Sequence, residues 1–493
     1  MSLLKDTCIN INEKYEAFPY QKEALEEIKN LKYAAIFHEQ GLGKTKIALD
    51  LLLYWLKEGL VDTVLVIAKK GLIENWKREF RVHTFITPRV LSQNRQENFY
   101  IFNSPARVIL AHFEIFNSES DRLKLFCKIR KIGIIVDESA KIKNPLSKLA
   151  RSFLDLSPYF ERRVIMTGTP IANRPYDIWA QINFLDQGET FGKNFDSFKN
   201  EYDITPDLNL DGEKRSLFES RIADIYRKIS SFTVRETKKS NVIELPNKIY
   251  ESLYADWEDT QLQIYERYIE ESKNEFIKNG TLVVDDANIV LKKLLRLVQV
   301  ASNPRLVDPL YQCLPGKFLI LQNLVDTIVS GMEKCIIWTN FNENVDWLEK
   351  QFKYLKAKKI YGKMDMTNRN KAVLSFIEDP QVKVLIASPG AAKEGLTLTV
   401  ANHVIFYDRV FSLDDYLQAQ DRIHRISQKK TCYVHNIIMK NSIDKWVDLL
   451  LNTKQEIASL GQGDINLDEF SKKIDYSFSD ILKKILYNEV IDE

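Results

Sequence analysis

Short runs of apolar, often β-branched residues alternate along the chain with polar loops and with segments whose apolar residues recur at helical spacing. This rhythm occurs in two regions, about residues 18–185 and 315–440. Strands that alternate with helices are typical of βαβ units and parallel sheets, so the pattern predicts an α/β fold with two lobes. The predicted strands are 33–37, 64–68, 108–111, 132–136 and 164–166 in the first lobe, and 335–339, 382–387, 404–407 and 433–438 in the second.

The segment between these regions is strongly charged, and its apolar residues recur mainly at helical spacing, as in Leu262, Tyr265 and Ile269. The sequence Leu-Pro-Asn-Lys at 245–248 is typical of a linker. We therefore expect four parts, which are a first lobe at 1–185, a helical insertion with the linker at 186–310, a second lobe at 311–455 and an acidic helical tail at 456–493.

The 493-residue chain has the composition of a globular protein, with 45% hydrophobic and 28% charged residues. Its 70 basic and 68 acidic residues nearly balance, so any nucleic-acid-binding surface must be a local patch. The five cysteines and six histidines are scattered without disulfide or zinc spacing, which favours a reducing compartment and predicts no structural metal. Because no apolar run could span a membrane and no secretion signal is visible, we expect a cytoplasmic protein.

The residues Gly41 to Thr45 (Gly-Leu-Gly-Lys-Thr) follow the first predicted strand and precede a segment with helical spacing. A strand, a glycine-containing loop and a helix in this order are typical of a phosphate-binding loop. There, backbone N–H groups close on the phosphates, Lys44 reaches the β- and γ-phosphates, and Thr45 binds Mg²⁺. His38 stands where the strict pattern has glycine, so the match is partial, and an ordinary glycine turn is the alternative.

Asp137 and Glu138 come directly after the predicted strand 132–136. Adjacent carboxylates at a strand end suit ATP hydrolysis, because one can hold Mg²⁺ while the other orients or deprotonates the attacking water. Two solvated acids at a strand end are the alternative. The phosphate loop upstream favours the catalytic interpretation.

The segment after Ser412 predicts a helix, with Ser412 as its N-cap and Asp415 three residues further on. Helical spacing would place Gln418, Arg422 and Arg425 on one face. Two arginines that point in one direction fit an arginine-finger role, in which they neutralise charge on the transferring phosphoryl group. A solvated basic helix face is the alternative.

The order of these motifs resembles helicase superfamily 2, and within it the sucrose-nonfermenting (Snf) family of double-stranded-DNA translocases. The resemblance covers about residues 18–450. The matching segments are 18–21 (the adenine-reading Q motif), 38–45 (the phosphate loop), 64–80 (motif Ia), 108–116 (the next strand motif), 137–144 (the Asp-Glu-Ala-His motif), 167–173 (motif III) and 418–428 (motif VI).

Three segments depart from the family pattern. Ala140 replaces the family's histidine, which couples ATP hydrolysis to lobe closure, so that coupling is expected to use other residues. Motif V, at 388–397, has an Ala-Ala-x-x-Gly-Leu-Thr form that resembles the fork-remodelling, strand-annealing branch. The family's Trp-Asn-Pro is Phe-Ser-Leu at 411–413, which leaves that DNA contact open. The compact motor resembles bacterial and viral members.

The resemblance implies two RecA-like lobes with a helical insertion between them and a short helical C-terminal tail, and it implies ATP and Mg²⁺ as cofactors. The expected catalytic residues are Lys44, Glu138, Arg422 and Arg425, the Mg²⁺ ligands are Thr45 and Asp137, and the coupling residues are Thr167 and Thr169. The expected ATP contacts are Gln21, Gln40, Gly41, Leu42, Gly43, Lys44, Thr45, Gly395 and Gln418.

The expected function is that of a DNA-dependent ATPase that translocates on double-stranded DNA and remodels protein–DNA or fork structures. Its contacts with the DNA backbone should be independent of sequence and sensitive to salt. Two alternatives stay open, a strand-separating DNA or RNA helicase and a nucleotide-gated DNA clamp within a defence, replication or repair complex. The candidate DNA contacts are Lys69, Lys70, Asn75, Lys143, Arg235, Lys238 and Lys393, and for each lysine a solvated surface charge is an equal alternative.

Overall fold

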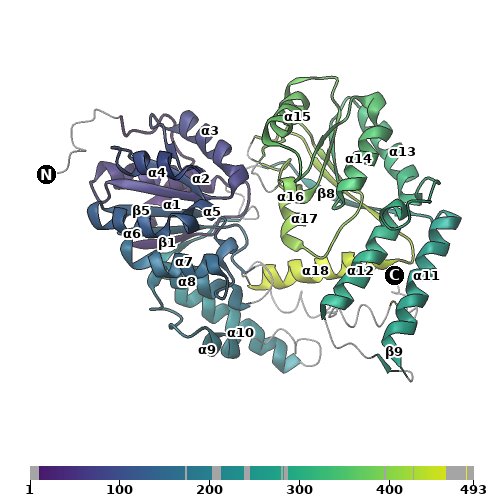
Figure 1. Cartoon of the computed structure of the whole chain (residues 1–493), viewed down its shortest axis with the longest axis horizontal. Coiled ribbons are helices and arrows are strands. Elements are labelled where there is room, and N and C mark those ends of the chain that lie inside the picture. The colour runs from purple at the N-terminus through teal and green to yellow at the C-terminus, as the bar shows by residue number, and fades with distance from the viewer. Residues whose placement is uncertain are drawn as a thin grey trace. The chain divides into compact units, whose positions relative to one another are not determined.

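The computed structural model describes residues 10–171, 175–202, 212–237, 245–278, 281–282, 287–392, 396–425, 427–461 and 485. The chain divides into two compact units, residues 1–244 with 458–467 and residues 245–457 with 468–493. Each unit contains one large parallel sheet with helices packed around it (Figure 1). The predicted α/β class with two parallel-sheet lobes is therefore confirmed.

The sheet of the first unit contains seven strands, β1 Tyr33–Ile36, β2 Thr63–Ala68, β3 Arg89–Val90, β4 Val108–His112, β5 Ile132–Asp137, β6 Arg162–Met166 and β7 Thr233–Val234. Their order is β3-β4-β2-β5-β6-β1-β7, and every neighbouring pair is parallel. The five strands predicted for this lobe are confirmed. The sequence pattern does not indicate β3 and β7, because a run of two residues carries no periodic signal.

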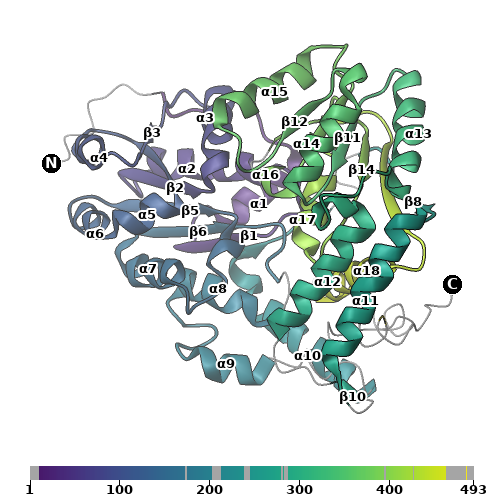
Figure 2. The ribbon, with the colours of Figure 1, turned by 45° about the vertical axis from the view of Figure 1, so that its right-hand side comes forward.

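Helices cover both faces of this sheet, since side chains of successive strand residues point to opposite faces and both sets are apolar. Figure 2 shows α2 on one face and α7 and α8 on the other. The helices are α1 Pro19–Ile28, α2 Lys44–Lys57, α3 Ile73–His83, α4 Arg95–Phe102, α5 Phe113–Ser118, α6 Ser120–Ile129, α7 Lys148–Leu156, α8 Trp179–Asp186, α9 Phe195–Tyr202 and α10 Gly212–Ile229.

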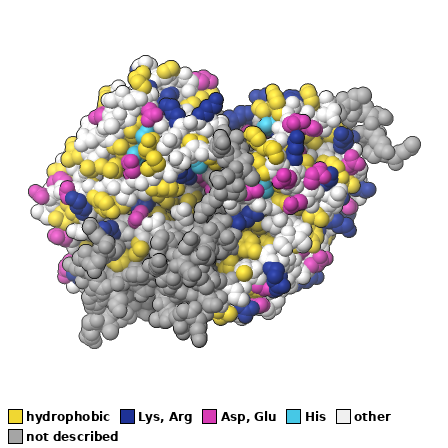
Figure 3. All heavy atoms as spheres, turned by 180° about the vertical axis from the view of Figure 1, so that it is seen from behind, with side chains coloured by type: hydrophobic (Ala, Val, Ile, Leu, Met, Phe, Trp, Pro, Cys, Tyr) yellow, Lys and Arg dark blue, Asp and Glu magenta, His cyan; other side chains and the backbone are white. Residues whose placement is uncertain are grey.

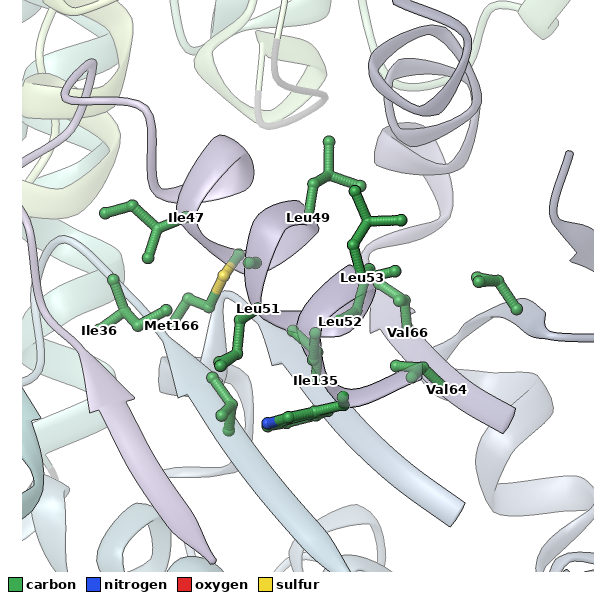
Figure 4. Close-up of a cluster of buried hydrophobic side chains, with 14 of the residues drawn as sticks. Ile36, Ile47, Leu49, Leu51, Leu52, Leu53, Val64, Val66, Ile135 and Met166 are labelled. Atoms are coloured by element: carbon green, nitrogen blue, oxygen red, sulfur yellow. The ribbon is translucent and has the colours of Figure 1, made fainter. Parts of the chain in front are cut away.

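Helix α2, which carries Lys44, is fixed by its buried face. Leu51 belongs to one buried cluster with Met166 of β6 (Figure 4). Full burial of such a side chain contributes roughly 1.5–3 kcal/mol. A Cβ at Gly133 of β5 would stand 3.0 Å from two ring atoms of Trp55, so this glycine makes room for the indole. This packing holds the start of α2 against the carboxyl ends of the strands.

The sheet of the second unit contains six strands, β8 Lys248–Ala255, β11 Cys335–Trp338, β12 Lys358–Ile360, β13 Val384–Ala387, β14 His403–Phe406 and β15 Cys432–Met439. Their order is β12-β13-β11-β14-β15-β8, again with parallel neighbours. The four predicted strands of this lobe are confirmed. The sequence pattern does not indicate β8 because it lies at the sheet edge and is largely exposed, nor β12, which has three residues.

The helices of the second unit include α11, which confirms the helical spacing around Leu262 and Tyr265. A two-stranded antiparallel hairpin, β9 Ile277–Lys278 and β10 Thr281–Leu282, follows α11. The helices are α11 Asp259–Phe276, α12 Ala287–Ser302, α13 Gly316–Ser330, α14 Asn342–Gln351, α15 Met366–Glu378, α16 Pro389–Ala392, α17 Leu413–Gln420 and α18 Ile443–Gly461.

The segment 186–310 belongs in part to each unit. α9 and α10 group with the first unit, where β7 joins the sheet, and α11 and α12 group with the second, where β8 joins the sheet. The division falls at 244/245, beside the Leu-Pro-Asn-Lys segment that the sequence indicates as a linker. Nearly all of the expected acidic tail lies outside the described residues. Within the described residues, no helix is both long and apolar enough to cross a membrane.

Candidate nucleotide site

Three strand ends that the sequence marks for chemistry lie side by side in the first unit. β5, β6 and β1 are consecutive and parallel, so their carboxyl ends share one edge of the sheet. The phosphate loop follows β1, Thr167 follows β6, and Asp137 ends β5. Ligands of open α/β sheets bind at the carboxyl ends of the strands, so this edge is the candidate nucleotide site.

Two glycines with left-handed backbone angles shape the phosphate loop. Gly41 has a φ of 89° and Gly43 a φ of 70°, which residues with a Cβ rarely adopt. Gly43 is the N-cap of α2, so the positive end of the helix dipole faces the loop, where an anion would be stabilised. Lys44 extends over the loop, where its Nζ donates to the carbonyl oxygens of His38 at 2.8 Å and Glu39 at 3.3 Å.

The loop after β6 approaches the phosphate loop closely. A Cβ at Gly168 would lie 2.7 Å from Cγ and 3.4 Å from the backbone nitrogen of Gln40, and 3.5 Å from Nζ of Lys44. Glycine is therefore required here by the close contact. Nε2 of Gln40 is buried and has no hydrogen-bond partner among the described residues, so this amide is available to a ligand.

Gln21 and Tyr20 support the phosphate loop from the start of α1. The hydroxyl of Tyr20 donates to the carbonyl oxygen of Leu42 at 2.9 Å, and Nε2 of Gln21 donates to that hydroxyl at 3.0 Å. Oε1 of Gln21 accepts from the backbone N–H of Phe18 at 3.1 Å. The side chain expected to contact adenine is thus hydrogen-bonded within the protein, and its adenine contact stays a prediction.

The two carboxylates differ in environment. Burial and the neighbouring Glu138 raise the pKa of Asp137 to about 6. The indole N–H of Trp76 in α3 donates to Oδ2 of Asp137 at 2.9 Å, a contact for which the sequence carries no signal. Glu138 has a φ of 57°, an uncommon left-handed conformation for a residue with a Cβ, and Lys69 lies 3.8 Å from its carboxylate.

His38, which departs from the strict phosphate-loop pattern, is buried beside the lysine. Its ring stacks on Tyr20 with the centroids 6.1 Å apart. Burial, followed by repulsion from the Lys44 ammonium, lowers the pKa of His38 to about 4. The imidazole is therefore neutral at physiological pH and adds no charge to the loop.

In the second unit, the predicted helix of motif VI is confirmed as α17, and its N-cap is Ser412. The Ser412 hydroxyl accepts from the backbone N–H of Asp415 at 3.3 Å. The helix ends at Gln420, so the expectation that three motif VI residues share one helical face is wrong. Beyond the helix, the carbonyl oxygen of Arg422 accepts from the backbone N–H of Leu398 at 2.9 Å.

Motifs V and VI form one hydrogen-bonded structure within the second unit. Arg425 donates to the Thr397 hydroxyl at 2.7 Å and to the carbonyl oxygen of Asp421 at 3.1 Å. Gln418 and Arg422 are buried, with 5% and 4% of their surface exposed, so the alternative of a solvated basic face does not hold for them. Oε1 of Gln418 has no hydrogen-bond partner among the described residues. Gly395 lies outside those residues.

The strand that begins the second unit is anchored on motif VI. Lys248 pairs with Asp421 at 3.0 Å, and the Tyr250 hydroxyl donates to Oε1 of Gln420 at 2.9 Å. The sequence carries no signal for these contacts, because they join residues 170 and 173 positions apart. Motif VI is therefore attached to the chain next to the linker.

The candidate DNA contacts in the described residues are not equally exposed. Lys143 pairs with Asp177 at 3.2 Å, and Arg235 follows β7 beside the phosphate loop. Lys70 is exposed and Asn75 accepts from Arg78 at 2.7 Å. On the face in Figure 3, basic side chains are interspersed with acidic ones. Lys238 and Lys393 lie outside the described residues.

A parallel sheet that carries a phosphate loop and an Asp-Glu pair at the same edge, on strands separated by one other strand, is typical of phosphate-loop nucleotide-binding proteins. The family follows from sequence comparison. The SNF2-related domain model matches residues 20–306, and the helicase conserved C-terminal domain model matches residues 316–427. The chain belongs to the SNF2-related family, and the resemblance to the Snf family is confirmed.

Relatives of this chain are longer proteins. An uncharacterized ATP-dependent helicase of Mycoplasma pneumoniae is 28% identical over 450 residues, which are 89% of this chain and 42% of the relative. The ISWI chromatin-remodeling complex ATPase ISW2 of Saccharomyces cerevisiae is 26% identical over 507 residues, covering 90% of this chain and 43% of the relative. The chain thus spans less than half the length of these two relatives. The Sulfolobus solfataricus SWI2/SNF2 ATPase core in complex with dsDNA is 24% identical, with a TM-score of 0.43 over 94% of this chain and 98% of that chain.

Proposed function

We propose that the protein is a DNA-dependent ATPase that translocates on double-stranded DNA. The observation that carries the proposal is the convergence of Lys44, Gly168 and the Asp137–Glu138 pair at three adjacent strand ends of the first unit. Membership of the SNF2-related family supports the same activity. Mycoplasma pneumoniae has a relative named as an ATP-dependent helicase, which adds to that support.

In the proposed site, the N–H groups at the start of α2 bind the phosphates and Lys44 binds the β- and γ-phosphates. Thr45 and Asp137 would hold Mg²⁺, which prefers oxygen ligands. The buried Asp137 carboxylate fits this role, because a cation would stabilise the ionised form that burial and Glu138 oppose. Bound Mg²⁺ would neutralise charge on the phosphates. Glu138 would orient or deprotonate the attacking water.

We propose an arginine-finger role for motif VI of the second unit. Arg422 and Arg425 would stabilise the charge on the transferring phosphoryl group, as arginine fingers do. The bond between Arg425 and Thr397 supports this role, because it holds the guanidinium in one orientation relative to motif V. Thr167 and Thr169 lie on the loop beside the phosphate loop. They would couple ATP binding and hydrolysis to movement along DNA.

Backbone contacts with the DNA are proposed to be independent of sequence, and Lys70, Asn75 and Arg235 are the described candidates that we favour. Forked DNA and partner proteins of a replication, repair or defence complex are further proposals, suggested by the form of motif V. We also propose a cytoplasmic location for this activity.

The proposal is tested by steady-state ATP turnover with duplex DNA, single strands, forks and RNA. Duplex DNA should give the largest stimulation, and Lys44→Ala should abolish turnover with every polynucleotide. Preferential stimulation by single strands or RNA would favour a strand-separating helicase instead. Nucleotide-dependent DNA binding without turnover would favour a clamp.

A further inference from the structure

A buried polar chain crosses the interior of the first unit behind the carboxylate pair. The hydroxyl of Ser139 donates to Oε1 of Gln181 at 2.7 Å. Nε2 of Gln181 donates to the carbonyl oxygens of Pro170 and Asp177, both at 3.0 Å. Ser139 and Gln181 are both 0% exposed.

The amide of Gln181 is completely used, since both of its N–H groups donate and its oxygen accepts. It lies in the first turn of α8 among buried apolar side chains, including Trp179 and Ile182. A polar side chain in such surroundings is costly unless every group is bonded, and removal of one partner leaves the others unsatisfied. The position of this amide is therefore fixed by three bonds to three segments.

Two of the three segments bonded to Gln181, those of Ser139 and Pro170, carry residues of the candidate nucleotide site. Ser139 directly follows Glu138 and begins the short 3₁₀ turn Ser139–Ile142. Pro170 belongs to the loop 167–170, in which Gly168 leaves no room for a Cβ beside Gln40 and Lys44. A shift of the Glu138 turn must therefore move Gln181, and through it the loop that lies against the phosphate loop.

A second bond runs in parallel with this chain. Lys143, one residue beyond the same 3₁₀ turn, pairs with the Asp177 carboxylate at 3.2 Å, while the Asp177 carbonyl oxygen accepts from Gln181. The 3₁₀ turn after β5 is thus bonded to the segment after β6 at its start, through Ser139, and just beyond its end, through Lys143. The neighbouring Ala140 has only a methyl group, so the polar connection from this turn runs through Ser139 and Lys143.

We propose that Gln181 is a positioning residue that couples the Glu138 turn to the Thr167–Pro170 loop, so that nucleotide state is transmitted between them. The inference rests on the proposed function, because it assigns Gln181 a part in the response of ATP turnover to DNA. It adds a residue that lies outside every motif on which the site was built.

The first experiment compares ATP turnover with and without duplex DNA in wild type, Gln181→Leu and the double variant Ser139→Ala/Gln181→Leu. The double variant replaces both partners of the 2.7 Å bond, so it should unfold closer to the wild-type temperature than Gln181→Leu does. In both variants the ratio of DNA-stimulated to basal turnover should fall about tenfold or more, with nucleotide affinity changed far less. A folded double variant with the wild-type ratio would overturn the proposal.

Asn183→Ala is the matched control. Asn183 lies on the same helix, and its Nδ2 donates to the carbonyl oxygen of Gly192 at 3.0 Å, away from the nucleotide site. This variant should keep the wild-type ratio. A ratio that falls equally in Asn183→Ala would show that any loss of a bond on α8 has the same effect, and would reject a specific role for Gln181.

A second experiment needs no DNA. Hydrogen exchange at the backbone amides of residues 167–169 and of Ile171 is measured with and without a non-hydrolysable ATP analogue. Binding should slow exchange there in wild type, and this protection should be lost in the double variant although the analogue still binds. Undiminished protection in the double variant would refute the coupling. Absence of DNA stimulation in wild type would instead refute the proposed function, and the exchange result would still decide the role of Gln181.

Discussion

Substitution of Gly168 by alanine tests whether motif III packs against the phosphate loop as described. The new Cβ would lie 2.7 Å from Cγ of Gln40, well inside van der Waals contact, and 3.4 Å from the Gln40 backbone nitrogen. Because Cγ is close to the main chain, the strain must displace the loop as well as the side chain. Overpacking of this kind costs about 1–3 kcal/mol. If the loop moves away from its binding geometry, nucleotide affinity should fall on the order of tenfold to a hundredfold.

The assay is equilibrium titration with a fluorescent ATP analogue, together with thermal unfolding of the same preparations. Gly362→Ala is the matched control, because a Cβ at Gly362 would have no atom within 4 Å. The control should bind nucleotide as wild type does. Wild-type affinity in a folded Gly168→Ala protein would refute the close approach of the two loops.

Three further predictions concern single side chains. Glu138→Gln should bind ATP normally while hydrolysis nearly stops, because the amide cannot accept a proton; single-turnover hydrolysis at the wild-type rate would exclude Glu138 as the base. Arg425→Ala should lower DNA-stimulated ATP turnover about 10³-fold or more. Arg425→Lys should restore little of this turnover, because a point charge lacks the guanidinium fork. Normal turnover in Arg425→Ala would reject the arginine-finger role. The pKa of His38 is about 4 in the folded protein and 6.5 in the unfolded chain. Between pH 4 and 6.5 the unfolded chain therefore binds more protons than the folded protein. Roughly 3 kcal/mol of stability should be lost as pH falls from 6.5 to 4. Unfolding midpoints of His38→Asn should depend less on pH over this range, and an unchanged dependence would contradict the assignment.

The residues at the strand ends could be predicted because their signals are local. Lys44 and Thr45 follow a strand and a glycine loop, and Asp137 ends an apolar run, so a few neighbouring positions suffice to identify each. The same holds for the Ser412 cap, whose hydroxyl bonds within its own helix turn. Each strand of four or more residues with a buried pattern could likewise be read from its composition.

The remaining contacts could not be predicted, because they join distant segments. The Trp76 indole reaches Asp137 across 61 positions, and Ser139 reaches Gln181 across 42. Helical spacing correctly indicates α17 but does not show that it ends at Gln420, before Arg422 and Arg425. β8 is missed for a related reason, because an exposed edge strand has no continuous apolar run.

In the proposed function, ATP hydrolysis drives movement along intact duplex DNA. The most direct measurement is the displacement of a triplex-forming third strand from duplex DNA, recorded with ATP, with a non-hydrolysable analogue, and with the Lys44→Ala variant. The account predicts displacement only with ATP and the wild-type protein, while the two duplex strands stay paired. It predicts a steep fall in rate with rising salt, because the contacts are to phosphates. Separation of the duplex strands, or ATP turnover on duplex DNA without displacement of the third strand, would contradict it.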